Sequence, residues 1–544
     1  MIDKKILGLA ALSGLVSACS TSTSNPSNHA GETQYITILQ TADIHGQLYA
    51  HDELFWENDR IHFKTLGGLA SVKTLFERER EANPKGTIIL DGGDLIQGSA
   101  EAALSEGNAF GPIVKAMGYD FIIPGNWEVV YGKQQMTDVL ESYETPVISA
   151  NMYHHESRDP LFPPYFIREV HGVKLGFISY NDPEIPIRQN PSFSEGIRFD
   201  SIRANLDALI AELKDEKGVD VLFLVTHIGI SKQFDLANHP ALERVDYILG
   251  NDTHERIRTP LDGKFAKVTE PGAFASFVGK LTLKVENGRV TEDTYELLEV
   301  DPDVYPPHTA MSELIARETA QYRQETETII GYSSTPLYRY FVVENPMDNF
   351  ITDAARWKTG VDISISNGFR FSPPIALNAN GVAPITEGHL WNMLPVNEKV
   401  KTGKATGEQI ASWLESELHH VFAQNPTERF GGWLVRFSGM EIEFYANRPE
   451  GERIASILVD GEPLQTDKLY TLSACRREGE ADNMLCRMPN ILEPQIMEYT
   501  IHDAVKEYLQ FHDTISPAVE SRAQALDLGD DVLSQLPGTS YHFH

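Results

Sequence analysis

Short apolar runs, each closed by a turn-forming or polar residue, recur along the first half of the chain. Runs of this length that end in Gly, Asp, Asn or His are typical of buried strands. The clearest are ITILQ (36–40), GTIIL (86–90), FIIP (121–124), VLFLVTH (221–227) and VDYILG (245–250). Between them lie segments with the apolar spacing of helices, at 71–81, 111–118 and 202–216. Strands that alternate with helices predict an α/β sheet.

The pattern changes near residue 302. FASFVGKLTLKVENGRV (274–290) predicts a closing strand pair with an Asn-Gly turn, and PDVYPPH (302–308) then breaks the unit. A polar, helix-prone stretch follows at 311–330. Beyond it we expect an α+β domain, with helices at 345–360 and 405–422 and strands at 361–371, 437–445, 454–464 and 468–474.

A chain of 544 residues is long enough for two or three domains. We expect a signal peptide (1–19), a polar tether (20–33), an α/β domain (34–305), a linker helix (306–330), an α+β domain (331–528) and a tail (529–544).

The first segment has the features of a targeting signal. Lys4 and Lys5 precede an apolar run that ends at Cys19, and the run is too short to span a membrane stably. The residues V-S-A-C resemble the lipobox of bacterial lipoproteins, which implies cleavage before Cys19 and a lipid attached to it. The resemblance therefore also implies a location in the bacterial cell envelope, with the lipid as the one membrane contact. An ordinary secretory leader is the alternative.

The charge balance limits the partners. Lys and Arg number 46 against 78 Asp and Glu, which gives a formal net charge of −32. Such a field repels nucleic acid and anionic membranes. An anionic substrate therefore needs a local positive site, which metal ions can supply.

Two cysteines remain after the leader, Cys475 and Cys486. In an oxidising compartment we expect a disulfide between them, worth roughly 3 kcal/mol on the chain-entropy model. Two free thiols are the alternative.

Polar residues at the ends of the predicted strands carry the candidate chemistry. Open α/β sheets build their sites at the carboxyl ends of strands. Seven oxygen or nitrogen donors follow five strands in order, namely Asp43, His45, Asp94, Asn126, His227, Asp252 and His254. Mixed carboxylate, amide and imidazole donors suit Mn²⁺, Zn²⁺ or Fe²⁺, and a pair of such ions can hydrolyse phosphoesters.

The order D-I-H, G-D, G-N-x-E, H, x-T-H resembles the calcineurin-like metallophosphoesterases, in particular the secreted 5′-nucleotidase family. The resemblance covers roughly residues 34–500. It implies a four-layer α/β sandwich with two divalent ions, Mn²⁺ or Zn²⁺, and a C-terminal substrate domain. It also implies that Asp43, His45, Asp94 and His254 bind one ion, and that Asn126, His227 and Asp252 bind the other with Asp94 as the bridge.

Two residues depart from the family pattern. Asp252 stands where the family usually has His, which should shift the preference towards Mn²⁺ or Mg²⁺. Trp127 replaces the histidine that contacts the oxyanion and helps the leaving group depart. Tryptophan can donate one hydrogen bond but cannot act as a general acid, and Glu128 is left without its imidazole partner. We therefore expect substrates whose leaving group departs as a stable anion.

The thiosulfohydrolase of the bacterial sulfur-oxidation (Sox) system also resembles this chain, because it has Trp in an H-W-E version of the motif. That resemblance implies hydrolysis of a sulfur-bound sulfonate on a carrier-protein cysteine. Asn126 and Asp252 depart from it. A metal-binding or oxyanion-binding lipoprotein without turnover is a third interpretation.

The second domain contains candidate substrate contacts. Asn367 and Arg370 in SNGFRFS (366–372) resemble a shortened form of the family loop that binds the anionic end of the substrate. The family's base-stacking aromatics correspond to regions that offer Phe430 or Trp433, with Leu434 the nearest match, and Asp482 with Met484. The comparison with the family's aromatic positions therefore predicts weak stacking against a nucleobase. The basic residues Arg476, Arg477 and Arg487 either contact an anion or form a solvated rim.

We therefore expect a dinuclear-metal hydrolase of small anionic esters, phosphate esters and possibly nucleotides, in which a hydroxide activated by the metals attacks. Trp127 and Glu128 lie at its catalytic position.

Overall fold

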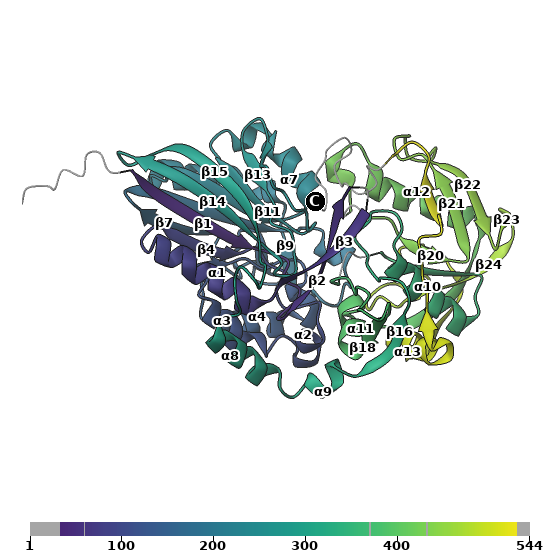
Figure 1. Cartoon of the computed structure of the whole chain (residues 1–544). Helices are drawn as coiled ribbons and strands as arrows, with labels where there is room; N and C mark the ends of the chain where they lie inside the picture. Colours follow the sequence, from purple (N-terminus) through teal and green to yellow (C-terminus); the bar gives the residue numbers. More distant parts are fainter. Residues whose placement is uncertain (1–32, 59, 369–371, 431–432, 530–544) are drawn as a thin grey trace, which may run out of the picture.

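The computed structural model describes residues 33–58, 60–368, 372–430 and 433–529. The predicted signal peptide with Cys19, nearly all of the tether, the tail and Arg370 lie outside the described residues. The chain forms two halves that lie side by side in Figure 1, with the N-terminal half in purple to teal and the C-terminal half in green to yellow.

The first sheet of the N-terminal half contains three of the five predicted apolar strands and the predicted closing pair. Its order is β15-β14-β1-β4-β5. The strands are β1 (Gln34–Thr41), β4 (Thr87–Asp91), β5 (Phe121–Ile122), β14 (Phe277–Glu286) and β15 (Arg289–Glu299). Strands β1, β4 and β5 are parallel, so their carboxyl ends meet at one edge. The predicted pair β14–β15 is confirmed, and its turn places Asn287 and Gly288 at φ 53° and 71°.

The second sheet has the order β12-β13-β11-β10-β8-β7. The strands are β7 (Tyr165–Val170), β8 (Val173–Asn181), β10 (Val221–His227), β11 (Tyr247–Asn251), β12 (Leu261–Asp262) and β13 (Lys267–Thr269). Strands β8, β10, β11 and β13 are parallel. The predicted strands that precede His227 and Asp252 thus belong to this sheet and not to the first.

Side-chain alternation explains why the two sheets stack. In β1, Ile38 belongs to the apolar core that joins both sheets, whereas the next residue, Leu39, packs in the cluster under the helices. Helices α1 (Leu69–Ala82), α2 (Ala100–Ser105), α3 (Phe110–Met117) and α4 (Lys133–Ser142) belong to the N-terminal half, as do α5 (Ile185–Arg188), α6 (Leu206–Ala211) and α7 (Ile230–Ala237). Helices α1, α3 and α4 cover the first sheet, and α6 and α7 cover the second. The result is the predicted four-layer sandwich.

Two features of this half differ from the sequence interpretation. The predicted linker helix is divided into α8 (Thr309–Thr319) and α9 (Arg323–Thr326). Met311 and Ile315, one helical turn apart, bury α8 in the core of the N-terminal half. A hairpin of β2 (Ala50–Glu57) and β3 (Arg60–Gly67) was not anticipated, and Figure 1 shows it between the two halves. A second small pair is β6 (Met152–His154) with β9 (Ile197–Phe199).

The C-terminal half is an α+β unit, as predicted, and it contains three sheets. Their orders are β20-β17-β24-β19-β25, β23-β22-β21-β27 and β18-β16-β26. The strands are β16 (Ile329–Ser333), β17 (Ile363–Ser366), β18 (Ala383–Thr386), β19 (Lys399–Thr406), β20 (Arg436–Ser438), β21 (Met440–Phe444), β22 (Ile454–Val459), β23 (Glu462–Pro463), β24 (Leu469–Cys475), β25 (Leu492–Thr500), β26 (Thr514–Ile515) and β27 (Ala523–Ala525).

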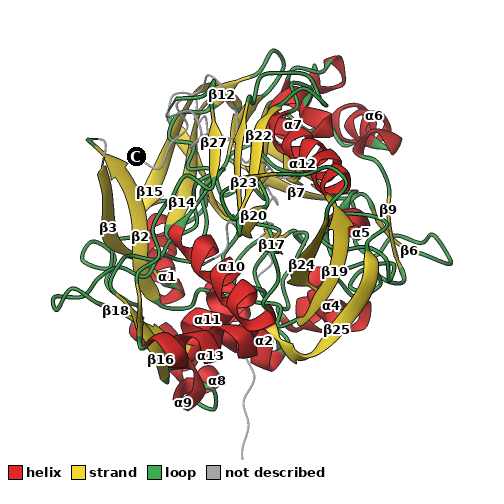
Figure 2. Ribbon diagram, turned by 90° about the vertical axis from the view of Figure 1, so that its right-hand side faces the viewer, coloured by secondary structure: helices red, strands yellow, loops and turns green. Residues whose placement is uncertain are grey.

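Both predicted helices of this half are present, and Figure 2 shows them at its front. Helix α10 (Pro346–Thr359) begins with Pro and ends at Gly360 with φ 67°, and α12 (Gly407–Phe422) begins at a Thr406–Gln409 capping box. Helices α11 (Glu387–Met393) and α13 (Ile501–His512) complete the unit. No helix in the described ranges has both the length and the apolar composition needed to cross a membrane.

Candidate metal centre

The seven predicted ligands come together where the two sheets of the N-terminal half meet. Asp43, His45, Asp94 and Asn126 follow strands of the first sheet, whereas His227, Asp252 and His254 end or follow strands of the second. All seven are buried, with exposed fractions between 0 and 6%. Charged groups at such depth are costly unless they are paired or bind a metal.

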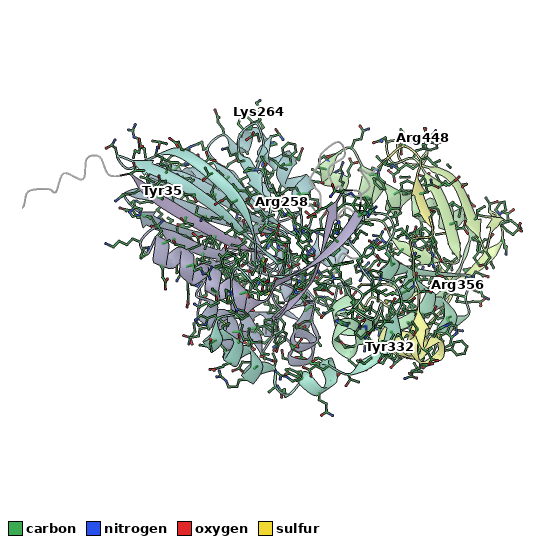
Figure 3. All side chains as sticks on the ribbon, in the orientation of Figure 1. Tyr35, Arg258, Lys264, Tyr332, Arg356 and Arg448 are labelled. Atoms are coloured by element: carbon green, nitrogen blue, oxygen red, sulfur yellow. The ribbon has the colours of Figure 1, made fainter. Side chains whose placement is uncertain are left out.

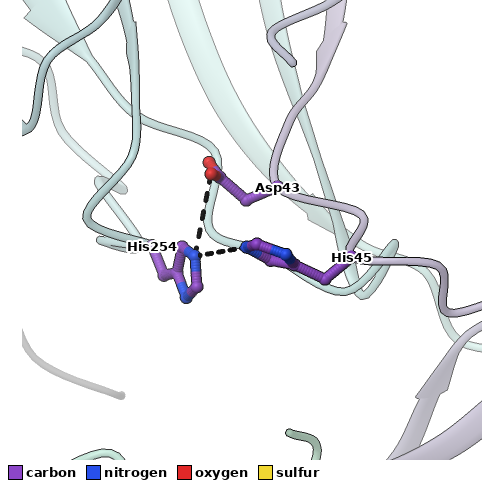
Figure 4. A group of neighbouring side chains, drawn as sticks. All are labelled: Asp43, His45 and His254. Carbon is purple, nitrogen blue, oxygen red and sulfur yellow. Dashed lines mark hydrogen bonds and ion pairs between the residues drawn. The ribbon is translucent and has the colours of Figure 1, made fainter. Parts of the chain in front are cut away.

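Two compact groups of donor atoms lie within this set. Asp43, His45 and His254 each place one donor within 4.8 Å of the others, and so do Asp43, Asp94 and His227. Figure 4 shows the first group, in which the Nε2 atoms of His45 and His254 converge to 3.0 Å. The Oδ2 atom of Asp94 lies 3.1 Å from Nε2 of His227 and 3.8 Å from Nε2 of His45. Asp43 is the residue common to both groups, and the Asp94 carboxylate lies near one imidazole of each group, His45 and His227.

Backbone carbonyls orient two of the imidazoles. Nδ1 of His45 lies 2.8 Å from the Gln97 carbonyl, and Nδ1 of His227 lies 2.8 Å from the Gly92 carbonyl. A carbonyl can only accept, so each Nδ1 carries the proton and directs Nε2 into the site. Metal-binding histidines are usually held by such a contact.

The backbone at these residues is in an uncommon conformation. Five of the seven predicted ligands have a positive φ, namely Asp43 (50°), His45 (48°), Asp94 (57°), Asp252 (93°) and His254 (60°). This region costs an L-residue roughly 1–2 kcal/mol. Such conformations cluster at functional sites, where the surrounding structure enforces them.

The electrostatics of the cluster fit divalent cations. Burial raises the pKa of Asp43 well above its ordinary value, and the neighbouring carboxylates add to the shift. Burial alone would lower the pKa of His227, but Asp94, Asp43 and Asp252 raise it well above the usual range. The buried Oδ1 of Asp43 accepts no hydrogen bond from the described residues, although Nε2 of His254 and of His227 lie 3.6 and 3.7 Å away. A cation among these donors would satisfy them and offset the crowded negative charge.

Asn126 and Asp252 lie beside the second group but outside the compact set. Nδ2 of Asn126 donates to Oδ1 of Asp252 at 2.8 Å, and that oxygen is 3.8 Å from Nε2 of His227. The sequence analysis missed a third residue here. Arg188 donates from Nη1 and Nη2 to the two carboxylate oxygens of Asp252, at 3.3 Å each, and it also pairs with Asp182.

The signal for Arg188 was present in the sequence. The strand β8 ends in the run GFISYND (176–182), an apolar stretch closed by Asn and Asp like the five strands that were counted. Asp182 is the polar residue at this sixth strand end, and it anchors Arg188 six residues later.

Trp127 and Glu128 have separate roles in the structure. Trp127 is 7% exposed and lines a pocket between the two halves of the molecule. Glu128 instead accepts backbone N–H groups of Asp94 (2.9 Å), Leu95 (2.7 Å) and Gly125 (2.6 Å). Burial and the Asp94 carboxylate raise the pKa of Glu128 to about 7. Glu128 thus joins the two loops that hold Asp94 and Asn126.

The pocket beside Trp127 receives some of the predicted substrate contacts. Asn367, Arg476 and Arg477 line it together with Arg188. Trp433 and Asp482 are not among the described lining residues, and Asp482 is exposed. Arg487 pairs with Glu417 and is also absent from the described lining.

The predicted disulfide is not formed. Cys475 and Cys486 are free thiols that line the same pocket. Burial raises the pKa of each thiol to about 12, so neither is a reactive thiolate near neutral pH. A disulfide needs Cβ atoms about 3.8 Å apart at a defined dihedral angle, and spacing along the chain does not fix that geometry.

These features define a buried cluster of candidate metal ligands beside a pocket between the two halves. The calcineurin-like phosphoesterase family model matches residues 36–256, and the 5′-nucleotidase C-terminal domain model matches residues 326–474. The chain is therefore similar to the calcineurin-like phosphoesterases, in the group that carries a 5′-nucleotidase C-terminal domain.

Individual relatives agree with this assignment. The chain is 26% identical to a 5′-nucleotidase of Vibrio parahaemolyticus over 95% of this chain and 96% of that one. The fold is similar to that of the sulfate thiohydrolase SoxB of Thermus thermophilus, with a TM-score of 0.80 at 21% identity over 91% and 97% of the chains. It is also similar to a 5′-nucleotidase precursor from the same organism, with a TM-score of 0.78 at 22% identity over 91% and 100%. The chain spans 33 to 58% of the length of the first three curated relatives it matches.

Proposed function

We propose that the protein hydrolyses small anionic esters, phosphate esters first and nucleotides among them, at a pair of divalent ions and without a histidine general acid. The observation that carries this proposal is the buried cluster of seven donors next to an indole at position 127. Bound divalent ions would supply an activated water and neutralise the charge that builds on the ester oxygens. Asp43, His45, Asp94 and His254 would hold one ion, and Asn126, His227 and Asp252 would complete the other with Asp94 shared.

The protein residues divide the remaining work. Trp127 forms a wall of the pocket and shields the ester from bulk water, which strengthens electrostatic contacts there. Asn367 orients the anion, together with Arg370, which lies outside the described residues. Glu128 positions the loops of Asp94 and Asn126 through its three backbone contacts.

Without a general acid, the leaving group has to depart as an anion. Lost acid catalysis typically costs about 10²–10⁴-fold in rate, and the cost shrinks when the leaving group is already stable. Esters of acidic alcohols and phenols are therefore the proposed best substrates, and nucleotides are proposed to be cleaved more slowly. Selectivity for a nucleobase is proposed to be weak, because the aromatic residues of the described lining, Trp127 and Phe193, both come from the N-terminal half.

A second candidate follows from Trp127 itself. The thiosulfohydrolase-like reaction would release sulfate from a sulfur-bound sulfonate on a carrier-protein cysteine, with a persulfide as a stable leaving group. The indole at position 127 and the fold shared with the sulfate thiohydrolase SoxB favour this alternative.

The proposal also includes the location of the protein. Cleavage before Cys19 and a lipid on that residue would hold it at the bacterial cell envelope, facing the periplasm or the surface. The residue pattern V-S-A-C and the polar tether to residue 33 support this part.

The test uses protein that begins at Gly31 and is reconstituted with Mn²⁺ after chelation. Hydrolysis of an aryl phosphate is measured beside release of sulfate from a thiosulfonate on a cysteine peptide, with Asp43→Asn as the inactive control. Aryl phosphate turnover that depends on Mn²⁺ supports the phosphoesterase proposal. Sulfate release alone would assign the sulfur reaction instead. Inactivity on both substrates, with the ions bound, would point to a binding protein without turnover.

A further inference from the structure

Arg188 is a buried guanidinium at the boundary between the metal centre and the pocket. Arg188 is the last residue of α5 and lies six residues after Asp182, the acid that follows β8. Its side chain is 11% exposed. Asp182 and Asp252 hold it from the N-terminal half, Asp252 through both carboxylate oxygens. Basic side chains such as Lys264 and Arg448 instead point outward at the surface, as Figure 3 shows. Arg188 thus brings a fixed positive charge to the buried cluster of acids.

The contacts of Arg188 leave donors for a ligand. A guanidinium has five N–H groups. Within the described part of the chain, the contacts with Asp182 and Asp252 use Nη1 twice and Nη2 once. The Nε–H and one Nη2 N–H remain, on a side chain that lines the pocket together with Trp127 and Asn367. Two parallel N–H groups match the spacing of two oxygens of a phosphate or sulfate group.

The C-terminal half fixes the backbone on both sides of Arg188. Nη2 of Arg477 donates to the carbonyl of Ile187 at 2.8 Å and to the carbonyl of Gln189 at 2.5 Å. Nδ2 of Asn190 donates to the Glu398 carboxylate at 2.7 Å. The position of Arg188 therefore depends on both halves, as expected for a group that meets a substrate held between them.

We infer that Arg188 binds the oxyanion of the substrate in the pocket that Trp127 also lines, with Asp182 and Asp252 holding its guanidinium in place. This inference rests on the proposed ester hydrolysis and names a residue that binds the oxygens of the group transferred to water. Arg188 offers the charge and the hydrogen bonds that the missing imidazole at position 127 would otherwise give the oxyanion. It cannot replace the imidazole as an acid, because a guanidinium stays protonated.

The competing explanation is that Arg188 only neutralises Asp252. The two roles differ in what they change. A partner of Asp252 alone would alter metal content and stability when removed, whereas an oxyanion contact would alter anion affinity with the metal retained. The variants are Arg188→Gln and Arg188→Lys, the second of which keeps the charge but loses the fork of two donors.

A matched control is available in the C-terminal half. Arg522 also pairs with two carboxylates, Asp353 and Glu520, and its side chain is 13% exposed. It is not among the described residues that line the pocket. Arg522→Gln therefore tests the loss of a partly buried arginine pair away from the site.

The measurement is calorimetric titration of the Mn²⁺-loaded protein with inorganic phosphate and, separately, with sulfate. Metal content by mass spectrometry and the melting temperature are recorded for each variant. We expect Arg188→Gln to lose roughly tenfold to a hundredfold in affinity for at least one anion, with two ions retained, since a hydrogen bond to a charged group is of that strength. Arg188→Lys should lie between, and Arg522→Gln should match the wild type.

Unchanged anion affinity in Arg188→Gln would overturn the inference, and so would a loss that merely follows a loss of bound Mn²⁺. Should Arg188→Gln fail to fold, a wild-type affinity in Arg188→Lys would overturn it equally. Binding does not require turnover, so the result also separates the two proposals. Anion affinity that depends on Arg188 in a protein inactive on every ester would support the inference and refute the proposed function.

Discussion

The backbone N–H of Trp127 donates a 2.7 Å hydrogen bond to Oδ1 of Asp94. This contact is made by the main chain, so any residue at position 127 except proline can make it. The side chain at that position is directed to the pocket instead. Position 127 therefore has two separable roles, one in holding the Asp94 carboxylate and one in lining the pocket. A change of side chain there should alter the reaction and leave the metal centre intact.

The three backbone contacts of Glu128 predict a strong effect of Glu128→Gln. A glutamine offers one oxygen and brings an NH₂ group towards backbone N–H donors, so at least one of the amides of Asp94, Leu95 and Gly125 loses its acceptor. We expect a loss of about 1–3 kcal/mol in the free energy of unfolding, measured by urea titration. The exposed Glu141→Gln serves as the control and should stay within about 0.5 kcal/mol of the wild type. Equal stabilities of the two variants would refute this role.

Metal removal should destabilise the N-terminal half. The carboxylates of Asp43, Asp94 and Asp252 surround His227, and divalent ions would relieve their mutual repulsion. A ligand present at 100 times its dissociation constant stabilises the native state by about 2.7 kcal/mol. The melting temperature should therefore fall on chelation with EDTA and recover as Mn²⁺ is added. Asp43→Asn should show a smaller recovery. A melting temperature that changes neither with EDTA nor with Mn²⁺ would contradict the metal assignment.

Acid should weaken the contact between the β2–β3 hairpin and the C-terminal half. Burial alone would raise the pKa of Glu53, but the Arg256 guanidinium, His51 and the Tyr340 hydroxyl hold it at about 2. The folded-state pKa lies below the ordinary value of 4.5, so this stabilisation is present above pH 4.5 and is lost as the pH falls towards 2.

The matching variant is Glu53→Gln, which leaves Arg256 as a buried charge without its carboxylate. We expect it to cost about 3–5 kcal/mol at pH 7 and to show a smaller fall in stability between pH 4.5 and pH 2 than the wild type. Urea unfolding at several pH values measures both. Parallel curves for the two proteins over that range would exclude Glu53 as the titrating group.

Local signals were sufficient for most of the N-terminal sandwich. Runs such as ITILQ and VLFLVTH are apolar over a strand length and end in polar residues, and both strands form, with donors at their carboxyl ends. These strands belong to two different sheets. This division depends on tertiary packing, that is, on which face of each strand is buried against the other sheet. The β2–β3 hairpin escaped notice because its apolar residues pack partly against Tyr338, Tyr340 and Phe341, far along the chain.

The parts of the site that could not be predicted depend on long-range geometry. Arg188 lies 64 residues from Asp252, and only the parallel pairing of β8, β10 and β11 brings their ends together. The cysteine pair illustrates the same limit. Cys475 and Cys486 are eleven positions apart in the sequence, and this spacing is compatible both with a disulfide and with two free thiols.

The measurement that tests the central claim most directly is a leaving-group series. kcat/KM is determined with Mn²⁺ for several aryl phosphates and for AMP, in the wild type, Trp127→His and Trp127→Phe, with bound metal checked in each. The account predicts that the wild type falls steeply from the aryl esters to AMP. It also predicts that Trp127→His raises AMP hydrolysis by about 10²–10⁴-fold with unchanged metal content, and that Trp127→Phe does not. A wild type that cleaves AMP as readily as the aryl esters, or a histidine variant without any gain on AMP, would contradict an active site that works without a general acid.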